Sequence, residues 1–142
     1  MILNTTYLDQ EKERIIDELV GSKLSFWKSI TIGRGSHRMI LDEYSNEFIK
    51  FLKPTSNLLY GNIEIREKGI FIRIAIKNYE TISWLIPYYK LSIFKSKHFS
   101  IHSDGSFLKF RRDSKYTMNL KFIKNLLNLK AQYSRIYHLN DA

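Results

Sequence analysis

The sequence predicts an α+β fold in which an antiparallel meander sheet of about six short strands lies between an N-terminal helical segment and a C-terminal covering helix. Three observations support this prediction. Isoleucines alternate with other residues over 70–76, as expected of a strand with one buried face. The dipeptide Asp104-Gly105 is typical of a tight hairpin turn. Apolar residues recur every three to four positions over 119–135, which indicates a helix after the last strand.

The first hairpin is predicted around Gly69. The isoleucines of residues 70–76 share one face of a strand, and the odd-numbered residues 71–77, which include Lys77, take the other. Ile63 and Ile65 alternate in the same way upstream. Residues 67–69 form the connection, and we expect Gly69 to supply the positive φ that a tight turn needs.

The second hairpin is predicted with its register. If Asp104 and Gly105 form a two-residue loop, His98 lies opposite Arg111 and Ser103 lies opposite Ser106. One face then carries the core residues Phe99, Ile101, Leu108 and Phe110. The other carries His98, Ser100, His102, Phe107, Lys109 and Arg111. A shift of one residue would exchange the two faces.

A break is predicted between the two hairpins. Ile82, Trp84 and Ile86 occupy one parity of the chain, and Leu91 and Ile93 occupy the other. Proline cannot donate to a strand ladder, so we expect a bulge or strand break at residues 87–89.

Helical segments are predicted on both sides of this region. Thr5 or Thr6 would cap a helix over 7–20, and Thr117 or Asn119 would cap one that runs to about Arg135. Residues 25–32 fit a short helix or a strand. Residues 39–53 have the three-to-four spacing of a helix, which Pro54 would end. The basic loop 33–38 could cradle a phosphate, but an ordinary connection is the preferred interpretation.

The length of 142 residues suits one domain, or one domain with an appendage. We expect an N-terminal helical segment over 1–54 and a sheet with its C-terminal helix over 58–137. The boundary would lie in the turn-rich residues 53–57.

The net charge of +9 is unevenly distributed. Residues 1–60 hold eight Lys or Arg and eight Asp or Glu, whereas residues 61–142 hold fifteen and six. The excess therefore belongs to the predicted sheet and its last helix. Such asymmetry favours an anionic partner, although solubility alone would also explain it.

The amino-acid composition limits which cross-links, catalytic groups and metal sites the protein can have. Cysteine is absent, which excludes disulfides and thiol catalysis. The start of the chain does not have the pattern of a signal peptide, and no apolar stretch is long enough to span a membrane, so we expect a cytoplasmic protein. His98 and His102 share a strand face, but the neighbouring Lys109 and Arg111 oppose a metal ion. We find no catalytic constellation and expect no enzyme activity, metal or cofactor.

The candidate binding site is a set of cations and aromatic side chains on the polar face of the sheet. Aromatic rings beside cations suit stacking on bases or contact with lipid headgroups. The alternative is that the phenylalanines lie beneath an N-terminal helix. The candidate residues are Lys90, Phe94, Lys95, Lys97, His98, Phe107, Lys109, Arg111 and Arg112.

Residues 58–135 resemble the pleckstrin-homology-like (PH-like) superfold in its bacterial versions. The resemblance rests on the hairpin around Gly69, the stretch 84–95 with its Ile86-Pro87 break, the Asp104-Gly105 hairpin and the helix from Asn119. It implies a scaffold that binds peptides, proteins or lipids. The basic cluster of the phosphoinositide-binding members is interrupted here, because Glu64 and Glu67 stand among the cations of the first hairpin.

We therefore expect a non-enzymatic binding module that engages a protein partner or an anionic surface through the basic face of the sheet. The alternative is a nucleic-acid-binding protein that uses the same face. Fold alone does not determine the ligand.

Overall fold

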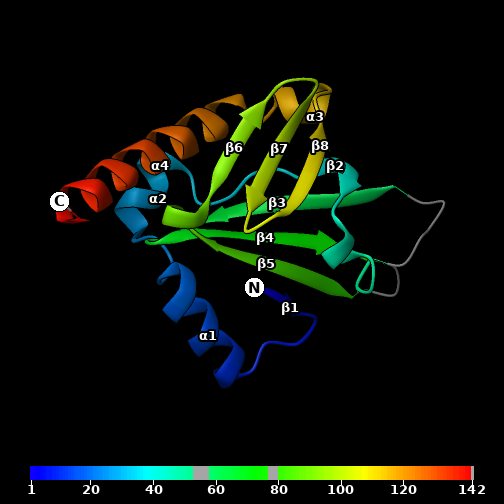
Figure 1. Ribbon diagram of the computed structural model, residues 1–142, viewed down its shortest axis with the longest axis horizontal. Coiled ribbons are helices and arrows are strands. Elements are labelled where there is room, and N and C mark those ends of the chain that lie inside the picture. The colour runs from blue at the N-terminus through cyan, green and yellow to red at the C-terminus, as the bar shows by residue number, and fades with distance from the viewer. Residues whose placement is uncertain (53–57, 77–79, 142) are drawn as a thin grey trace.

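The computed structural model describes residues 1–52, 58–76 and 80–141, with side chains through Tyr133 (Figure 1). Eight strands and four α-helices are assigned within these residues. The strands are β1 (Ile2–Asn4), β2 (Met39–Tyr44), β3 (Leu59–Ile65), β4 (Gly69–Ala75), β5 (Thr81–Pro87), β6 (Ser92–Lys95), β7 (His98–Ser103) and β8 (Ser106–Arg111). The helices are α1 (Gln10–Val20), α2 (Phe26–Ile32), α3 (Ser114–Thr117) and α4 (Leu120–Asp141), with 3₁₀ turns η1 (Asn46–Phe48) and η3 (Tyr88–Lys90).

All eight strands form one antiparallel sheet in the order β1-β5-β4-β3-β2-β8-β7-β6. The α+β class and the antiparallel sheet are confirmed, but the sheet has eight strands where about six were expected. The additional strands β1 and β2 come from the N-terminal segment that was expected to be helical. Figure 1 shows β6, β7 and β8 running steeply across the direction of β3, β4 and β5, because the sheet twists strongly between its two halves.

The hairpin β3–β4 is confirmed, with Ile63 opposite Ile72 and Ile65 opposite Ile70. The reason given for Gly69 was wrong, because this residue does not have a positive φ. Its role is steric. A Cβ at Gly69 would lie 2.3 Å from the carbonyl oxygen of Ile86 on β5, closer than two such atoms can approach. Lys77 lies outside the described residues.

The hairpin β7–β8 has the predicted register, from His98 opposite Arg111 to Ser103 opposite Ser106. Asp104 and Gly105 have φ values of 51° and 83°, as a two-residue turn with two left-handed positions requires. Phe99, Ile101, Leu108 and Phe110 are all buried, so the assignment of the core face is also confirmed.

The predicted break at Pro87 is confirmed. β5 ends at this residue, η3 follows, and β6 begins at Ser92. Tyr88 remains buried and its hydroxyl donates a hydrogen bond to the carbonyl of Arg66 at 3.0 Å. Through this hydrogen bond, η3, which precedes β6, contacts the connection between β3 and β4.

The helix predicted over 39–53 is wrong in the described residues, which form β2 and η1 instead. β2 lies in the middle of the sheet, and the consecutive residues Met39, Ile40 and Leu41 are all buried. A strand that is buried on both faces loses its two-residue alternation, so the remaining apolar spacing resembles that of a helix. Pro54 and the proposed boundary at 53–57 lie outside the described residues.

The other helices differ from the predictions mainly at their ends. α1 begins at Gln10 and is capped by Asp9, not by a threonine, and it ends before Gly21 as expected. Residues 26–32 are helical, which resolves the ambiguity in that segment. α3 is a separate short helix capped by Asp113, and α4 extends to Asp141, beyond the expected end at Arg135.

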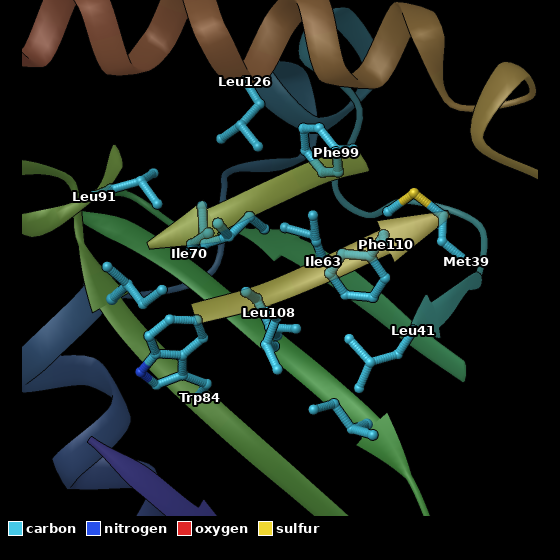
Figure 2. Close-up of a cluster of buried hydrophobic side chains, with 14 of the residues drawn as sticks. Met39, Leu41, Ile63, Ile70, Trp84, Leu91, Phe99, Leu108, Phe110 and Leu126 are labelled. Atoms are coloured by element: carbon cyan, nitrogen blue, oxygen red, sulfur yellow. The ribbon is translucent and has the colours of Figure 1, made fainter. Parts of the chain in front are cut away.

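The main core lies between the two halves of the sheet, and α4 packs against it. Figure 2 shows Leu126 of α4 pointing toward the cluster that contains Phe99 and Ile70. Phe122 and Ile123 of α4 are buried in the same core. A second, smaller cluster lies on the opposite face of β4 and β5, where α1 packs on Phe71 and Leu85.

Candidate functional site

The register of β6, β7 and β8 places one row of side chains outside the core. We call this surface the outer face, and it comprises Phe94, His98, Ser100, His102, Phe107, Lys109 and Arg111. Five of the nine predicted site residues belong to it: Phe94, His98, Phe107, Lys109 and Arg111. The Asp104-Gly105 turn brings these residues together, because it determines which parity of β7 and β8 faces outward.

Aromatic rings occupy the middle of the outer face. Phe94 is 54% exposed, and its ring centre lies 5.1 Å from that of His102 in an edge-to-face contact. Phe107 lies 5.7 Å from His102 on the other side. Lys109 places its Nζ 5.1 Å from the centre of the Phe107 ring. This central group can contact a flat or apolar ligand group while a cation lies beside it.

Desolvation by the surrounding side chains lowers the pKa of His102, and the positive charge of Lys109 lowers it further. Both effects disfavour the imidazolium form. His102 therefore contributes a neutral ring at neutral pH, and its Nε2 lies 3.1 Å from the hydroxyl of Ser100. Its role on the outer face is aromatic rather than cationic.

Two carboxylates from β2 lie among the cations of the outer face. Asp42 accepts three hydrogen bonds from Arg111, the shortest at 2.8 Å, and lies 3.2 Å from Nε2 of His98. Glu43 lies 3.4 Å from Nζ of Lys109. The sequence interpretation missed both carboxylates, because it placed them on a helix instead of beside β8. The outer face is therefore a mixed-charge surface around an aromatic centre.

The remaining predicted residues lie at two different places. Lys95 has the parity of the core face but is exposed at the end of β6, and Lys97 follows in the connection to β7. Neither lysine forms an ion pair within the described residues. Arg112 donates to the carbonyl of Ser96 at 2.6 Å and lies over the ring of Tyr116. These three cations border one end of the outer face.

Lys90 does not belong to this surface. It forms an ion pair with Asp104 at 3.3 Å, at the other end of β7 and β8. There it borders a groove of about 920 Å³ whose apolar lining includes Ile2, Ile49, Phe51, Trp84 and Tyr89. The groove carries charges of both signs, since Lys50, Lys90 and the N-terminal amino group of Met1 are accompanied by Glu47 and Asp104.

Neither described N-terminal helix packs on Phe94 or Phe107. α1 buries Ile16 and Val20 against Phe71 and Leu85, on the other half of the sheet. α2 lies beside α4, where the amide of Asn125 donates to the carbonyl of Ile32 at 2.8 Å. The alternative in which a helix covers the two phenylalanines is therefore wrong.

The two arginines of the first hairpin, Arg66 and Arg73, form their contacts within the protein. Arg66 is buried and forms an ion pair with Glu64, and Arg73 donates to the same carboxylate at 3.2 Å. Both guanidinium groups also lie over the ring of Phe71. This arrangement lies close to α1, whose Asp17 is 3.4 Å from Arg66. The hairpin therefore does not present these arginines as a cluster of free cations.

The loop 33–38 pairs with β3. The N–H of Ser36 donates to the carbonyl of Ile63 at 2.8 Å, and the carbonyl of Arg34 accepts from Ile65 at 2.8 Å. The N–H of His37 donates to the side chain of Asn119. Because these backbone groups have partners, the contacts favour the ordinary connection over a phosphate cradle.

Within residues 1–52, 58–76 and 80–141, no three His, Asp or Glu side chains lie close enough to hold a metal ion. No helix in this part of the chain is long and apolar enough to cross a membrane. Comparisons with protein-family models, with curated proteins and with solved structures give no match to this chain. The functional assignment therefore rests on the residues and contacts of the chain itself.

Proposed function

We propose that this protein is a non-enzymatic binding module whose outer face engages an acidic segment of a partner protein. The observation that carries the proposal is the exposed ring of Phe94 beside His102 and Phe107, on a sheet face that neither α1 nor α2 covers. An aromatic anchor surrounded by polar groups is the usual composition of a protein-binding surface.

The distribution of charge supports a protein partner over a polyanion. Phosphates that approached Lys109 or Arg111 would also meet Glu43 or Asp42. A peptide can place a carboxylate near Lys95 or the nearby Lys97 and an apolar side chain against Phe94. Mixed charges on a surface also give specificity, because a wrongly charged partner is repelled.

We also propose that the fold is PH-like and that the protein works in the cytoplasm. Two consecutive meanders, β2–β5 and β6–β8, are followed by α4, and this order supports the PH-like proposal. The cysteine-free sequence suits a reducing compartment. In such a scaffold the sheet and its loops would provide the binding surface.

The second candidate function is binding of single-stranded nucleic acid. The specific observation in its favour is the row of three rings on the outer face, since bases stack on exposed aromatic side chains. Lys109 over Phe107 would then face the phosphate backbone.

Fluorescence anisotropy with two labelled probes separates these functions. One probe is a peptide of alternating Glu and Leu, and the other is a twenty-nucleotide oligouridylate. We expect the peptide to bind, and Phe94→Ala to weaken it about tenfold, since truncation of an interface anchor typically costs more than 1 kcal/mol. Lys68→Gln, on the exposed β3–β4 connection, is the control and should leave the affinity unchanged.

Amide chemical shifts should move on β6, β7 and β8 as the peptide is added. Oligouridylate binding whose affinity falls steeply with salt and is lost in Phe94→Ala would support the second candidate instead. Peptide binding that moves only shifts outside these strands would contradict both assignments of the outer face.

A further inference from the structure

Helix α2 exposes large apolar side chains to solvent. Phe26 is 67% exposed, Trp27 77% and Ile30 63%. Phe26 and Ile30 are four positions apart and so lie on the same side of the helix, and the rings of Phe26 and Trp27 meet edge to face at 5.6 Å. A contiguous patch of this kind is unusual on the surface of a protein and marks a site of interaction.

The opposite side of α2 is anchored to the protein. Ser25 caps the helix, and the carbonyl of Ile32 accepts from Asn125 of α4 at 2.8 Å. Ile32 packs against the main core, and Lys28 forms an ion pair with Glu67 at 3.2 Å. Because these contacts determine the rotation of the helix, its apolar residues point away from the protein. Figure 1 shows α2 beside α4, away from β8.

The exposed surface continues beyond the helix. Ile30 and the exposed Met118, between α3 and α4, line the same shallow hollow, and Lys121 of α4 borders it. We define the α2 patch as Phe26, Trp27, Ile30 and Met118. It combines two segments that are distant in sequence, so the sequence interpretation could not identify it.

Cations lie on the segments next to the α2 patch, and Lys121 lines the same hollow as Ile30 and Met118. Arg34 follows the helix, and Lys121 and Lys124 lie on consecutive turns of α4; all three are exposed and form no ion pair within the described residues. Lys28 is the only cation of α2, and Glu67 pairs with it. Insertion of apolar side chains with a basic rim is the way that peripheral proteins bind anionic bilayers.

We propose that the α2 patch docks on the surface of an anionic lipid bilayer. Trp27 and Phe26 would enter the interfacial layer, where aromatic rings are preferred, and Ile30 and Met118 would bury their apolar surface beside them. Arg34, Lys121 and Lys124 would contact the headgroups. A second copy of this chain is a poorer occupant, since a symmetric contact through this patch would bring the same unpaired cations together. The proposal does not depend on the outer face.

The test uses vesicles of phosphatidylcholine with 30% phosphatidylserine, and vesicles of phosphatidylcholine alone. The protein has two tryptophans, and Trp84 is only 3% exposed, so a change of emission on binding reports on Trp27. We expect cosedimentation with the anionic vesicles, a blue shift of the emission, and loss of binding at high salt.

Two paired substitutions separate the apolar and ionic contributions. Trp27→Ser with Ile30→Ser should weaken binding tenfold or more, since each apolar side chain contributes by its buried area. Lys121→Gln with Lys124→Gln should weaken it roughly thirtyfold, from about 1 kcal/mol per cation near an anionic surface. Tyr7→Ser, which removes an equally exposed aromatic ring before α1, is the matched control and should leave binding unchanged.

Three results would overturn the proposal. The first is no preference for anionic vesicles over neutral ones. The second is vesicle binding that survives Trp27→Ser with Ile30→Ser but is lost in Lys95→Gln with Lys97→Gln, which would assign it to the other surface. The third is a dimer at micromolar concentration that the α2 substitutions dissociate, which would identify a second copy as the occupant. Circular dichroism of each variant excludes unfolding as the cause.

Discussion

Arg111 on β8 and Asp42 on β2, which lie 69 positions apart in the sequence, form an ion pair with two short hydrogen bonds. Nη2 of Arg111 donates to Oδ1 of Asp42 at 2.8 Å, and Nε donates to the same oxygen at 3.1 Å. The pairing of β2 with β8 shifts between Leu41 and Glu43, so Asp42 is the extra residue of a β-bulge. Bulges redirect side chains, and this one directs a carboxylate to the cations of the outer face.

This pair predicts a specific dependence of stability on pH. The hydrogen bonds from Arg111 hold the pKa of Asp42 below its ordinary value of 3.8. The folded protein therefore binds this proton more weakly than the unfolded chain does. The stabilisation is fully present above about pH 5 and is lost as the pH falls through the lower folded-state pKa. Asp42→Asn should flatten the decline in the free energy of unfolding below about pH 4, as measured by urea denaturation at a series of pH values.

Glu43→Gln is the control for this measurement, because it removes the neighbouring carboxylate on the same strand. Its contact with Lys109 is longer, at 3.4 Å, and more exposed. The decline in the free energy of unfolding of Glu43→Gln at low pH, which we call the acid limb, should therefore match that of the wild-type protein. An Asp42→Asn variant with an unchanged acid limb would contradict the role assigned to the pair.

A second prediction concerns the carboxylate beneath α1. Glu64 is buried with two arginines bound to it, and Arg66 is itself buried. Glu64→Gln would leave Arg66 without its principal counter-charge and should lower the free energy of unfolding by about 3 kcal/mol. Glu18→Gln breaks the exposed pair with Arg14 and should cost less than about 0.5 kcal/mol. Comparable losses in the two variants, in urea denaturation at pH 7, would show that the buried cluster is not structurally important.

The sequence predicts those parts of the fold whose signals are local. Asp104 and Gly105 determine the register of β7 and β8, because a two-residue turn is compatible with only one pairing of the two strands. β2 could not be predicted in the same way. Its partners, β3 and β8, lie far from it in the chain, and its buried residues 39–41 do not alternate. β1, with three residues, is too short to give a periodic signal.

The same difference explains the outcome for the candidate site. The aromatic centre of the outer face could be predicted, since Phe107 and His102 face each other across one local hairpin. Its charge could not, because Asp42 reaches Arg111 only through the pairing of two distant strands. Lys90 was predicted on the outer face but pairs with Asp104 at the other end of β7 and β8. The sequence does not show how far apart two residues lie along neighbouring strands.

A third prediction distinguishes the two ways in which glycines serve the hairpins. Gly69→Ala would force a methyl group against the carbonyl of Ile86, at 2.3 Å, and should destabilise the protein by about 2–3 kcal/mol. Gly105→Ala meets no atom within 4 Å, and its cost comes only from the left-handed φ of 83°, roughly 1 kcal/mol. Thermal denaturation of both variants measures the difference. A smaller loss for Gly69→Ala than for Gly105→Ala would contradict the steric explanation.

The last prediction concerns Asn119, which, with Thr117 as the alternative, was predicted to cap the C-terminal helix. Its backbone carbonyl does accept the first bond of α4, from Ile123. Its buried side chain, however, connects α4 to the loop before β2. Oδ1 accepts from the N–H of His37 at 2.8 Å, and Nδ2 donates to the carbonyls of His37 and Lys115 at 3.2 and 3.0 Å.

Asn119→Ala would leave three backbone groups without these partners and should cost about 2–3 kcal/mol. Asn119→Asp keeps the acceptor for His37 but places a second oxygen against two carbonyls, so it should be at least as damaging. Asn128→Ala, on the exposed side of the same helix, should change the free energy of unfolding by less than about 0.5 kcal/mol. If Asn119→Ala loses stability but amide exchange in residues 33–38 is unchanged, the side chain serves α4 alone. Faster exchange in that loop would establish that Asn119 holds it against the helix.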